Sequence, residues 1–450
     1  MSYVKVIVPY TLALYFILKA RKQPVFLLGI PFLMSMGTSI FFERAILFYK
    51  PGSWGLSLNI LKWMIASWFY IKVVANRQIT LSASGNSGKK NFLTLMDSFV
   101  GLLLVLSVMN LISNLAEYRD TSGMMAEAAD YVSLLIGYFF LKSIFIHSDE
   151  RSLISFLDAI VLIITIGSLI FVLHQGLGFR LHEGEEYLET SVGREIITRT
   201  WMFMPIYVSF AFVYSLSKGR FTLTNMTSML INGTAIFFSY ARSVVFGLVL
   251  IIGVYYALVA IKGGRKLRIM GKVLKFGLAL LLGIYLASLL FPAQYYYFSS
   301  RMEDLALNPQ QSNFTYRLDQ TQLLFASLRA QQFFLGSGFL SASENSIVDW
   351  MKLKTSDIVW AGVGFHWGAV GLLLFGLLCV MCLVKTYKIF LGSTGAVSYL
   401  ALLLFLLVLN QLAEGFGRWT FLNPIGLPMG LWYVAAASAL TGWWQKGTRT

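Results

Sequence analysis

Charged residues are scarce in this sequence. Only 13% of its 450 residues are Asp, Glu, Lys or Arg, while 57% are apolar. Soluble domains usually hold about 25% charged residues, so this composition excludes a soluble globular protein. Apolar runs recur along most of the chain, far too many for a signal peptide or a single anchor, and no cleavable leader precedes them. Because runs of about 20 apolar residues cross a membrane as helices, the expected fold class is all-α, a polytopic transmembrane helix bundle.

Residues that hold metals, disulfides and nucleotides are also few. The two cysteines, Cys379 and Cys382, lie in one apolar run, so we interpret them as packing residues and expect no structural disulfide. None of the four histidines is paired at zinc-ligand spacing. The sequence has no GxxxxGK[ST] loop for ATP, and no Asp-x-Asp pair in an outward-facing loop. We therefore expect no cofactor and no metal, so arginines would have to neutralise any bound phosphate.

The apolar runs predict 12–13 transmembrane helices. Between the tenth and the eleventh lies a long segment, 292–357, which divides the chain into a bundle over 1–291, an outer loop, and a second bundle part over 358–450. The expected helices lie near residues 4–18, 25–42, 56–75, 92–115, 131–147, 153–173, 200–217, 222–239, 243–261, 273–291, 358–384, 397–413 and 425–444.

Lysine and arginine predict the orientation of the bundle. They concentrate in the segments after the odd-numbered spans and at the C-terminus, with the strongest run at 262–275. This positive-inside pattern predicts a cytoplasmic C-terminus. Because the basic residues are spread over short loops, we expect anionic membrane lipids as their neighbours and no nucleic-acid partner.

Two long loops fall on the predicted outer side. The loop over 174–200 is rich in acids, and the loop over 292–357 contains an amphipathic pattern that starts at Ser312 and stops at Gly336 and Gly338. Long loops in a compact protein are usually functional or disordered, so we expect the chemistry on the outer face. The aromatic run "PAQYYYFSS" (292–300) is compatible with stacking on sugar rings or with an interfacial aromatic belt.

Several arginines lie close to outer span ends. Arg242 lies between two apolar runs, where it is either a snorkelling interfacial residue or an anion site. Arg317 and Arg329 lie twelve residues apart on the amphipathic pattern, about 120° apart around a helix. One of them therefore faces a cavity if the other faces water.

The remaining polar candidates lie in and near the last spans. Asp357 heads a long apolar run, where it either favours the helix dipole or belongs to a site. His366 lies deeper in the same run and is interpreted as a packed residue. Glu414 and Arg418 have the i, i+4 spacing of a structural ion pair.

Three segments, in order, resemble the O-antigen ligase and polymerase superfamily of bacterial membrane glycosyltransferases. They are "SYAR" (239–242), Arg317 ahead of "LGSGF", and Asp357 followed by ten residues and then "GAVG" (368–371). In ligases of this family the third segment usually begins His-Asn, whereas this chain has Asp357-Ile358, which is compatible with the more variable polymerases. The resemblance implies a helix bundle with a large periplasmic loop. It also implies a glycan donor on polyprenyl diphosphate, with no nucleotide sugar and no metal.

The resemblance also implies roles for particular residues. Arg242 and Arg317 would bind the diphosphate, and Asp357 would act as the base that deprotonates the acceptor hydroxyl, more effectively if it is partly buried. Further substrate-binding candidates are Ser239, Tyr295, Tyr296, Arg329, Glu414 and Arg418.

The expected function is a polysaccharide polymerase of the bacterial inner membrane that joins carrier-linked repeat units on the periplasmic face. A flippase and a chain-length regulator are its expected partners. One alternative is a ligase that moves the finished glycan onto a lipid core. Another is a transporter of lipid-linked glycans, although the sequence shows no inverted repeat and no pair of interrupted helices.

Overall fold

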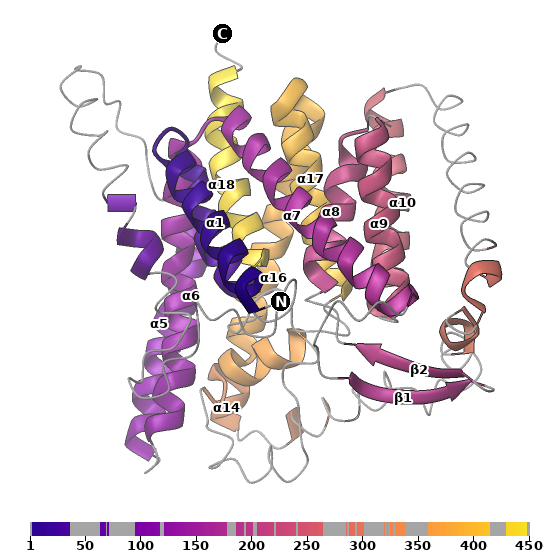
Figure 1. The fold of residues 1–450 in the computed structure, drawn as a ribbon. Coiled ribbons are helices and arrows are strands. Elements are labelled where there is room, and N and C mark those ends of the chain that lie inside the picture. Colours follow the sequence, from indigo (N-terminus) through magenta and orange to yellow (C-terminus); the bar gives the residue numbers. More distant parts are fainter. Residues whose placement is uncertain are drawn as a thin grey trace.

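The computed structural model is a bundle of α-helices, with a small β-hairpin at one end (Figure 1). The structure describes residues 2–36, 64–68, 70–71, 95–117, 121–177, 186–192, 195–200, 205–219, 222–239, 242–263, 285, 288–292, 295–300, 319, 322, 325–326, 330–338, 359–414 and 429–447. Its elements are α1 (Ser2–Ala20), η1 (Pro24–Leu28), α2 (Gly29–Met36), α5 (Leu95–Glu117), α6 (Thr121–His147), α7 (Glu150–Leu177), β1 (Glu186–Val192), β2 (Glu195–Thr200), α8 (Pro205–Ser217), α9 (Leu223–Phe238), α10 (Arg242–Gly263), α14 (Ala330–Leu335), α16 (Val359–Gly392), α17 (Gly395–Glu414) and α18 (Met429–Gly447).

Within these described ranges, five helices are long and apolar enough to cross a membrane. They belong to α5, α7, α10, α16 and α17, and shorter apolar helices accompany them. The prediction of an all-α, polytopic membrane bundle is therefore confirmed. Helices α9 and α10 are separate, as their sequence pattern indicated, whereas α6 begins at Thr121, well before the expected 131. Most of 56–75 and 273–291 lies outside the described residues, so the total of 12–13 spans stays a prediction.

The acid-rich loop over 174–200 contains secondary structure that the sequence analysis did not predict. Strands β1 and β2 form an antiparallel hairpin in which Glu189 lies opposite Thr198 and Thr190 opposite Ile197. β-branched residues are frequent in both strands, which suits a pleated backbone. The hairpin and α14 lie at the same end of the bundle, and the C-terminus lies at the opposite end (Figure 1). The two loops predicted to share the outer side thus do share one end.

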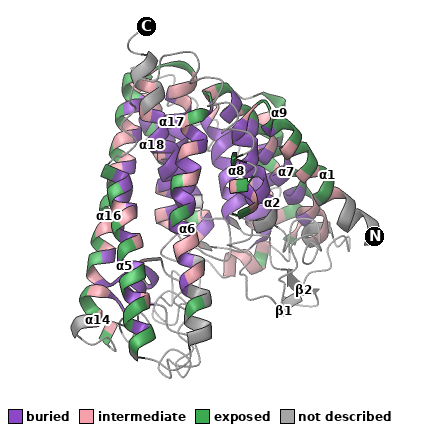
Figure 2. Ribbon diagram, turned by 90° about the vertical axis from the view of Figure 1, so that its left-hand side faces the viewer, coloured by how far each residue is buried: buried purple, intermediate pink, exposed green. Residues whose placement is uncertain are grey.

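The buried residues gather where helices face one another (Figure 2). Helices α8 and α17 are buried over most of their length, while α5 and α16 keep apolar side chains such as Ile112 and Leu373 exposed. Such exposed apolar side chains suit a lipid environment. A cavity of about 50 Å³ between α7, α8, α17 and α18 is lined by apolar and aromatic side chains. None of the predicted site residues that the structure describes lines it.

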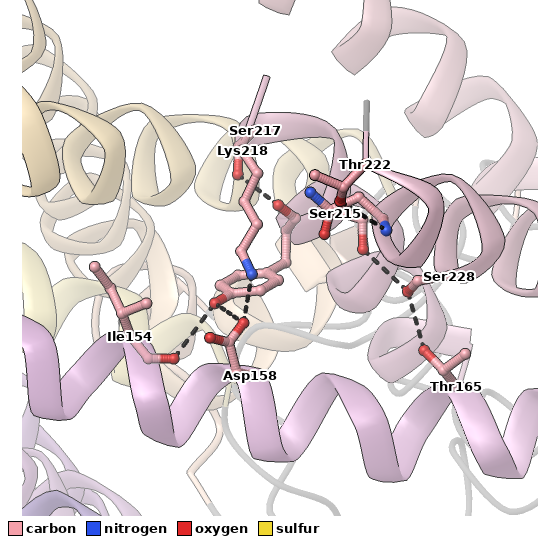
Figure 3. Close-up of polar contacts among 10 residues, drawn as sticks. Ile154, Asp158, Thr165, Ser215, Ser217, Lys218, Thr222 and Ser228 are labelled. Carbon is pink, nitrogen blue, oxygen red and sulfur yellow. Dashed lines mark hydrogen bonds and ion pairs between the residues drawn. The ribbon is translucent and has the colours of Figure 1, made fainter. Parts of the chain in front are cut away.

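A seam of small polar side chains joins α7, α8 and α9. Ser228 of α9 shares hydrogen bonds of 3.0 Å with Thr165 of α7 and with Ser215 of α8 (Figure 3). Asn232 donates to Thr165 at 3.0 Å and accepts from Ser168 at 2.7 Å. In lipid, small and polar residues of this kind let helices approach closely and hold them together.

Ion pairs lie at the end of the bundle opposite α14. Asp158 of α7 accepts from Lys218 and, at 2.7 Å, from the hydroxyl of Tyr214 (Figure 3). A second pair joins Asp97 of α5 to Lys142 of α6, and both of these side chains are buried. Each pair links neighbouring helices.

Candidate functional site

Helix α14 ends in a Gly-Ser-Gly segment, residues 336–338, which we call the strap. Gly336 has φ +88° and Gly338 has φ +72°, values that glycine adopts at no steric cost. The prediction that these glycines stop the loop helix is confirmed at its C-terminal end. Ser312 and the residues expected to begin that helix lie outside the described part of the chain.

Helix α16 is interrupted within the glycine-rich sequence "GVGFHWGAVG". Gly368 has φ +63° and ψ −164°, a conformation essentially restricted to glycine. A Cβ atom on Gly368 would lie 2.4 Å from the carbonyl oxygen of Phe334 and 2.5 Å from the backbone nitrogen of Gly336. This sequence is therefore a close-packing surface. The interruption of the helix was not predicted.

The strap lies in the interruption of α16 and bonds to it. The backbone N–H of Ser337 donates to the carbonyl of Phe365 at 2.8 Å, and the Ser337 hydroxyl donates to the same oxygen at 3.0 Å. Nδ1 of His366 donates to the carbonyl of Gly338 at 2.9 Å. A helix that breaks leaves its last carbonyls without intrahelical donors, and the strap supplies donors at this position.

Two asparagines of α5 complete the junction. Nδ2 of Asn110 donates to the carbonyl of Leu335 at 2.8 Å and to that of His366 at 2.9 Å. Nδ2 of Asn114 donates to the carbonyl of Ser337 at 3.0 Å. Both side chains are buried. Together they tie the strap and the broken helix to a third, continuous helix.

His366 is a packed residue, as predicted. It is buried, its Nε2 lies 3.4 Å from the hydroxyl of Tyr131, and the two ring centroids are 4.9 Å apart. The next residue, Trp367, donates its Nε1–H to the hydroxyl of Ser107 on α5 at 2.8 Å. These contacts fix the first turns of α16 against α5 and α6.

The first motif segment, "SYAR", lies at the turn between α9 and α10. Ser239 is buried and donates its hydroxyl to the carbonyl of Ile236 at 2.7 Å, while Arg242 is the first residue of α10. The aromatic run packs beside this turn, since the rings of Phe237 and Phe298 are 4.9 Å apart. Phe238 and Phe291 form a similar contact at 5.1 Å.

The two tyrosines predicted to bind sugar lie in this aromatic run. Tyr296 is 62% exposed and Tyr295 is partly buried. Tyr296 is therefore available to stack on a ligand ring or to face the membrane interface. The aromatic run that carries these tyrosines packs beside the turn with Ser239 through Phe298.

Glu414 lies inside the bundle. Its side chain is fully buried, and its Oε1 accepts from the hydroxyl of Ser209 at 2.7 Å and from Nδ2 of Asn410 at 2.8 Å. A Cβ atom on Gly247 of α10 would lie 3.0 Å from Oδ1 of Asn410. This burial favours a structural role for Glu414 over direct substrate contact.

Several predicted site residues are outside the described part of the structure. They are Arg317, Arg329, Asp357 and Arg418, together with the side chain of Arg242. The expected ion pair between Glu414 and Arg418 and the expected roles of the arginines and Asp357 therefore stay predictions.

Asn110 and Asn114 were not among the predicted site residues. A signal was present, because Ser107, Asn110 and Asn114 recur at i, i+3 and i+7 on one face of an otherwise apolar run. Polar residues repeated on one helix face within a membrane indicate a buried polar partner. The sequence did not indicate what that partner was.

No protein-family model matches the chain, and no curated protein is significantly similar to it. The glycosyltransferase resemblance therefore stands on the three motif segments alone. Among the residues that the structure describes, no group of three or more His, Cys, Asp and Glu could hold a metal ion. That the protein works without a metal stays a prediction.

Proposed function

We propose that this protein polymerises lipid-linked polysaccharide repeat units. In this proposal it transfers a glycan from polyprenyl diphosphate to an acceptor sugar on a second carrier lipid. The observation that supports the proposal most is the junction of two motif segments. Gly336 of "LGSGF" and Gly368 of "GAVG" lie so close that neither position has room for a side chain.

This junction is irregular backbone between apolar helices. Such backbone is tolerated at membrane depth where it is buried in protein or lines a water-filled cavity. The strap follows the segment with Arg317 and Arg329, and α16 begins two residues after Asp357. The junction therefore holds the described ends of both segments on which the proposed chemistry depends.

The reaction needs charge neutralisation more than it needs an acid. An acceptor hydroxyl oxygen attacks the anomeric carbon of the donor and forms the new glycosidic bond. The bond from that carbon to the diphosphate oxygen breaks, and the polyprenyl diphosphate leaves with the electron pair. Arg242 and Arg317 would stabilise the leaving charge, and Asp357 would take the hydroxyl proton.

The proposed reaction requires a particular membrane location and two partner proteins. The protein would lie in the bacterial inner membrane with the end that carries the strap and hairpin in the periplasm and the C-terminus in the cytoplasm. A flippase would supply repeat units, and a chain-length regulator would act with the polymerase. Ser239, Tyr295, Tyr296 and Arg329 are the proposed glycan contacts. Transfer to a lipid core, the ligase reaction, would use the same donor chemistry.

The interruption of α16 favours one other candidate function. Many transporters bind their substrates at broken helices near the middle of the membrane. A flippase for lipid-linked glycans would therefore also suit an interrupted α16. The two long segments at one end of the bundle favour chemistry on one face over alternating access.

The test is the glycan ladder of cells that lack this protein, complemented with wild type or with Asp357→Asn. We expect collapse to a single repeat unit, rescued by wild type and not by Asp357→Asn. Long chains that stay on the carrier lipid would indicate the ligase. An unchanged ladder would contradict glycan transfer and favour transport.

The arginines are tested by Arg242→Lys and Arg317→Lys. Lysine keeps the charge but loses the fork that matches phosphate oxygens, so we expect each variant to lose most chain elongation at unchanged protein level. The measurement is ladder length together with the amount of protein in the membrane. Wild-type ladders from both variants would contradict the proposed diphosphate site.

A further inference from the structure

We propose that Asn110 and Asn114 are positioning residues of the polymerase. This inference rests on the proposed function and deepens it. By binding the strap to the interruption of α16, the two amides hold the ends of the segments that carry the proposed arginines and Asp357. They act through those segments and do not touch the substrate.

Asn110 makes a contact that few side chains can make. A single nitrogen, Nδ2, donates to two carbonyls from different parts of the chain, Leu335 and His366, at 2.8 and 2.9 Å. An amide nitrogen has two hydrogens to donate, whereas serine has one and leucine or ionised aspartate has none. Asn110 therefore bridges α14 and α16 through their backbones.

Asn114 holds the middle of the strap. Its Nδ2 donates to the carbonyl of Ser337, and the absent Cβ of Gly338 would lie only 2.5 Å from that nitrogen. The glycine is what lets the amide approach. Asn110 and Asn114 lie about one helical turn apart on the same face of α5.

The remainder of α5 is independent of the strap. Met96, Val100, Leu103 and Leu106 are buried in the apolar core. Loss of an asparagine amide should therefore release the strap from α5 while α5 stays in the bundle. The expected result is a folded protein with a misplaced catalytic segment.

Asn110→Asp tests this inference, with Asn232→Asp as the matched control. Both asparagines are buried and both donate to a backbone carbonyl, but Asn232 lies in the seam between α7 and α9. Aspartate keeps the shape but cannot donate to two carbonyls, because its ionised form has no hydrogen to donate and its protonated form has one. Chain elongation would be measured with purified protein and the lipid-linked repeat unit extracted from cells that lack the protein.

We expect Asn110→Asp to lower kcat at least ten-fold, with KM and Tm close to those of Asn232→Asp. Equal kcat for the two variants would overturn the positioning role, as would a wild-type kcat for Asn110→Asp. If wild type itself elongates no chains, the proposed function fails, and that outcome is distinguishable from failure of the inference.

Discussion

The two ends of the bundle provide partners for their polar groups in different ways. At the strap, the polar side chains that bind the irregular backbone are neutral, and Asn110, Asn114 and Ser337 donate to backbone carbonyls. At the other end, charged side chains pair with each other, Asp97 with Lys142 and Asp158 with Lys218.

The difference separates structural from functional polar groups. The ion pairs join regular helices whose backbone hydrogen bonds lie within each helix. The charged side chains therefore neutralise each other and do not bind the backbone. At the strap the backbone is irregular, and the side chains of Asn110 and Asn114 donate hydrogen bonds to its carbonyls. Irregular backbone at membrane depth is tolerated only where it is buried in protein or lines a water-filled cavity, and we expect function at the strap end.

The largest effect on stability is expected from the buried ion pair. Asp97→Leu leaves Lys142 without its carboxylate, and Lys385 of α16 lies within electrostatic range of both residues. Removing one partner of a buried pair costs about 3–5 kcal/mol of unfolding free energy. Chemical denaturation would measure this loss. Adding Lys142→Met should restore most of it, and a double variant as unstable as Asp97→Leu would contradict a structural pair.

A smaller loss of stability, together with loss of activity, is expected for Gly368→Ala. Alanine at φ +63° and ψ −164° costs about 1–3 kcal/mol, and its Cβ would contact the Phe334 carbonyl. Thermal unfolding and chain elongation are the measurements. The control is Gly376→Ala in the same helix, where a Cβ meets nothing within 4 Å. Similar behaviour of the two variants would refute the need for the interruption.

The polar seam between α7, α8 and α9 should contribute less to the stability of the protein. Asn232→Leu removes hydrogen bonds to Ser228 and Thr165, and hydrogen bonds between membrane helices average about 0.6 kcal/mol. We expect a modest decrease in Tm and unchanged kcat. A loss of elongation at wild-type stability would indicate that the seam has a functional role. It would contradict the view that function is confined to the strap end.

The smallest effect is expected for the partly exposed pair. Asp158→Asn removes the partner of Lys218, and exposed pairs contribute about 0–1 kcal/mol and are screened by salt. Unfolding at low and high salt would measure this contribution. A loss comparable with that of Asp97→Leu would show that the pair behaves as a buried one.

Local patterns predicted the helices and one turn well. The bounds of α7 and α17 followed from apolar runs, and the end of α14 followed from Gly336 and Gly338, because both signals act within a few residues. The β1–β2 hairpin was missed because its strands lie in a polar loop without a clear alternating pattern. The interruption of α16 was missed because glycine also occurs in continuous membrane helices.

Composition and periodicity alone determined that this protein is a membrane helix bundle, because lipid leaves the backbone few other ways to satisfy its hydrogen bonds. They also placed the two long segments on one side. Only the tertiary structure decided that the strap lies in the interruption of α16 and that Asn110 and Asn114 bind both. Those contacts join residues more than 200 positions apart in the sequence, and hydrogen bonds at that separation exist only once the helices have packed.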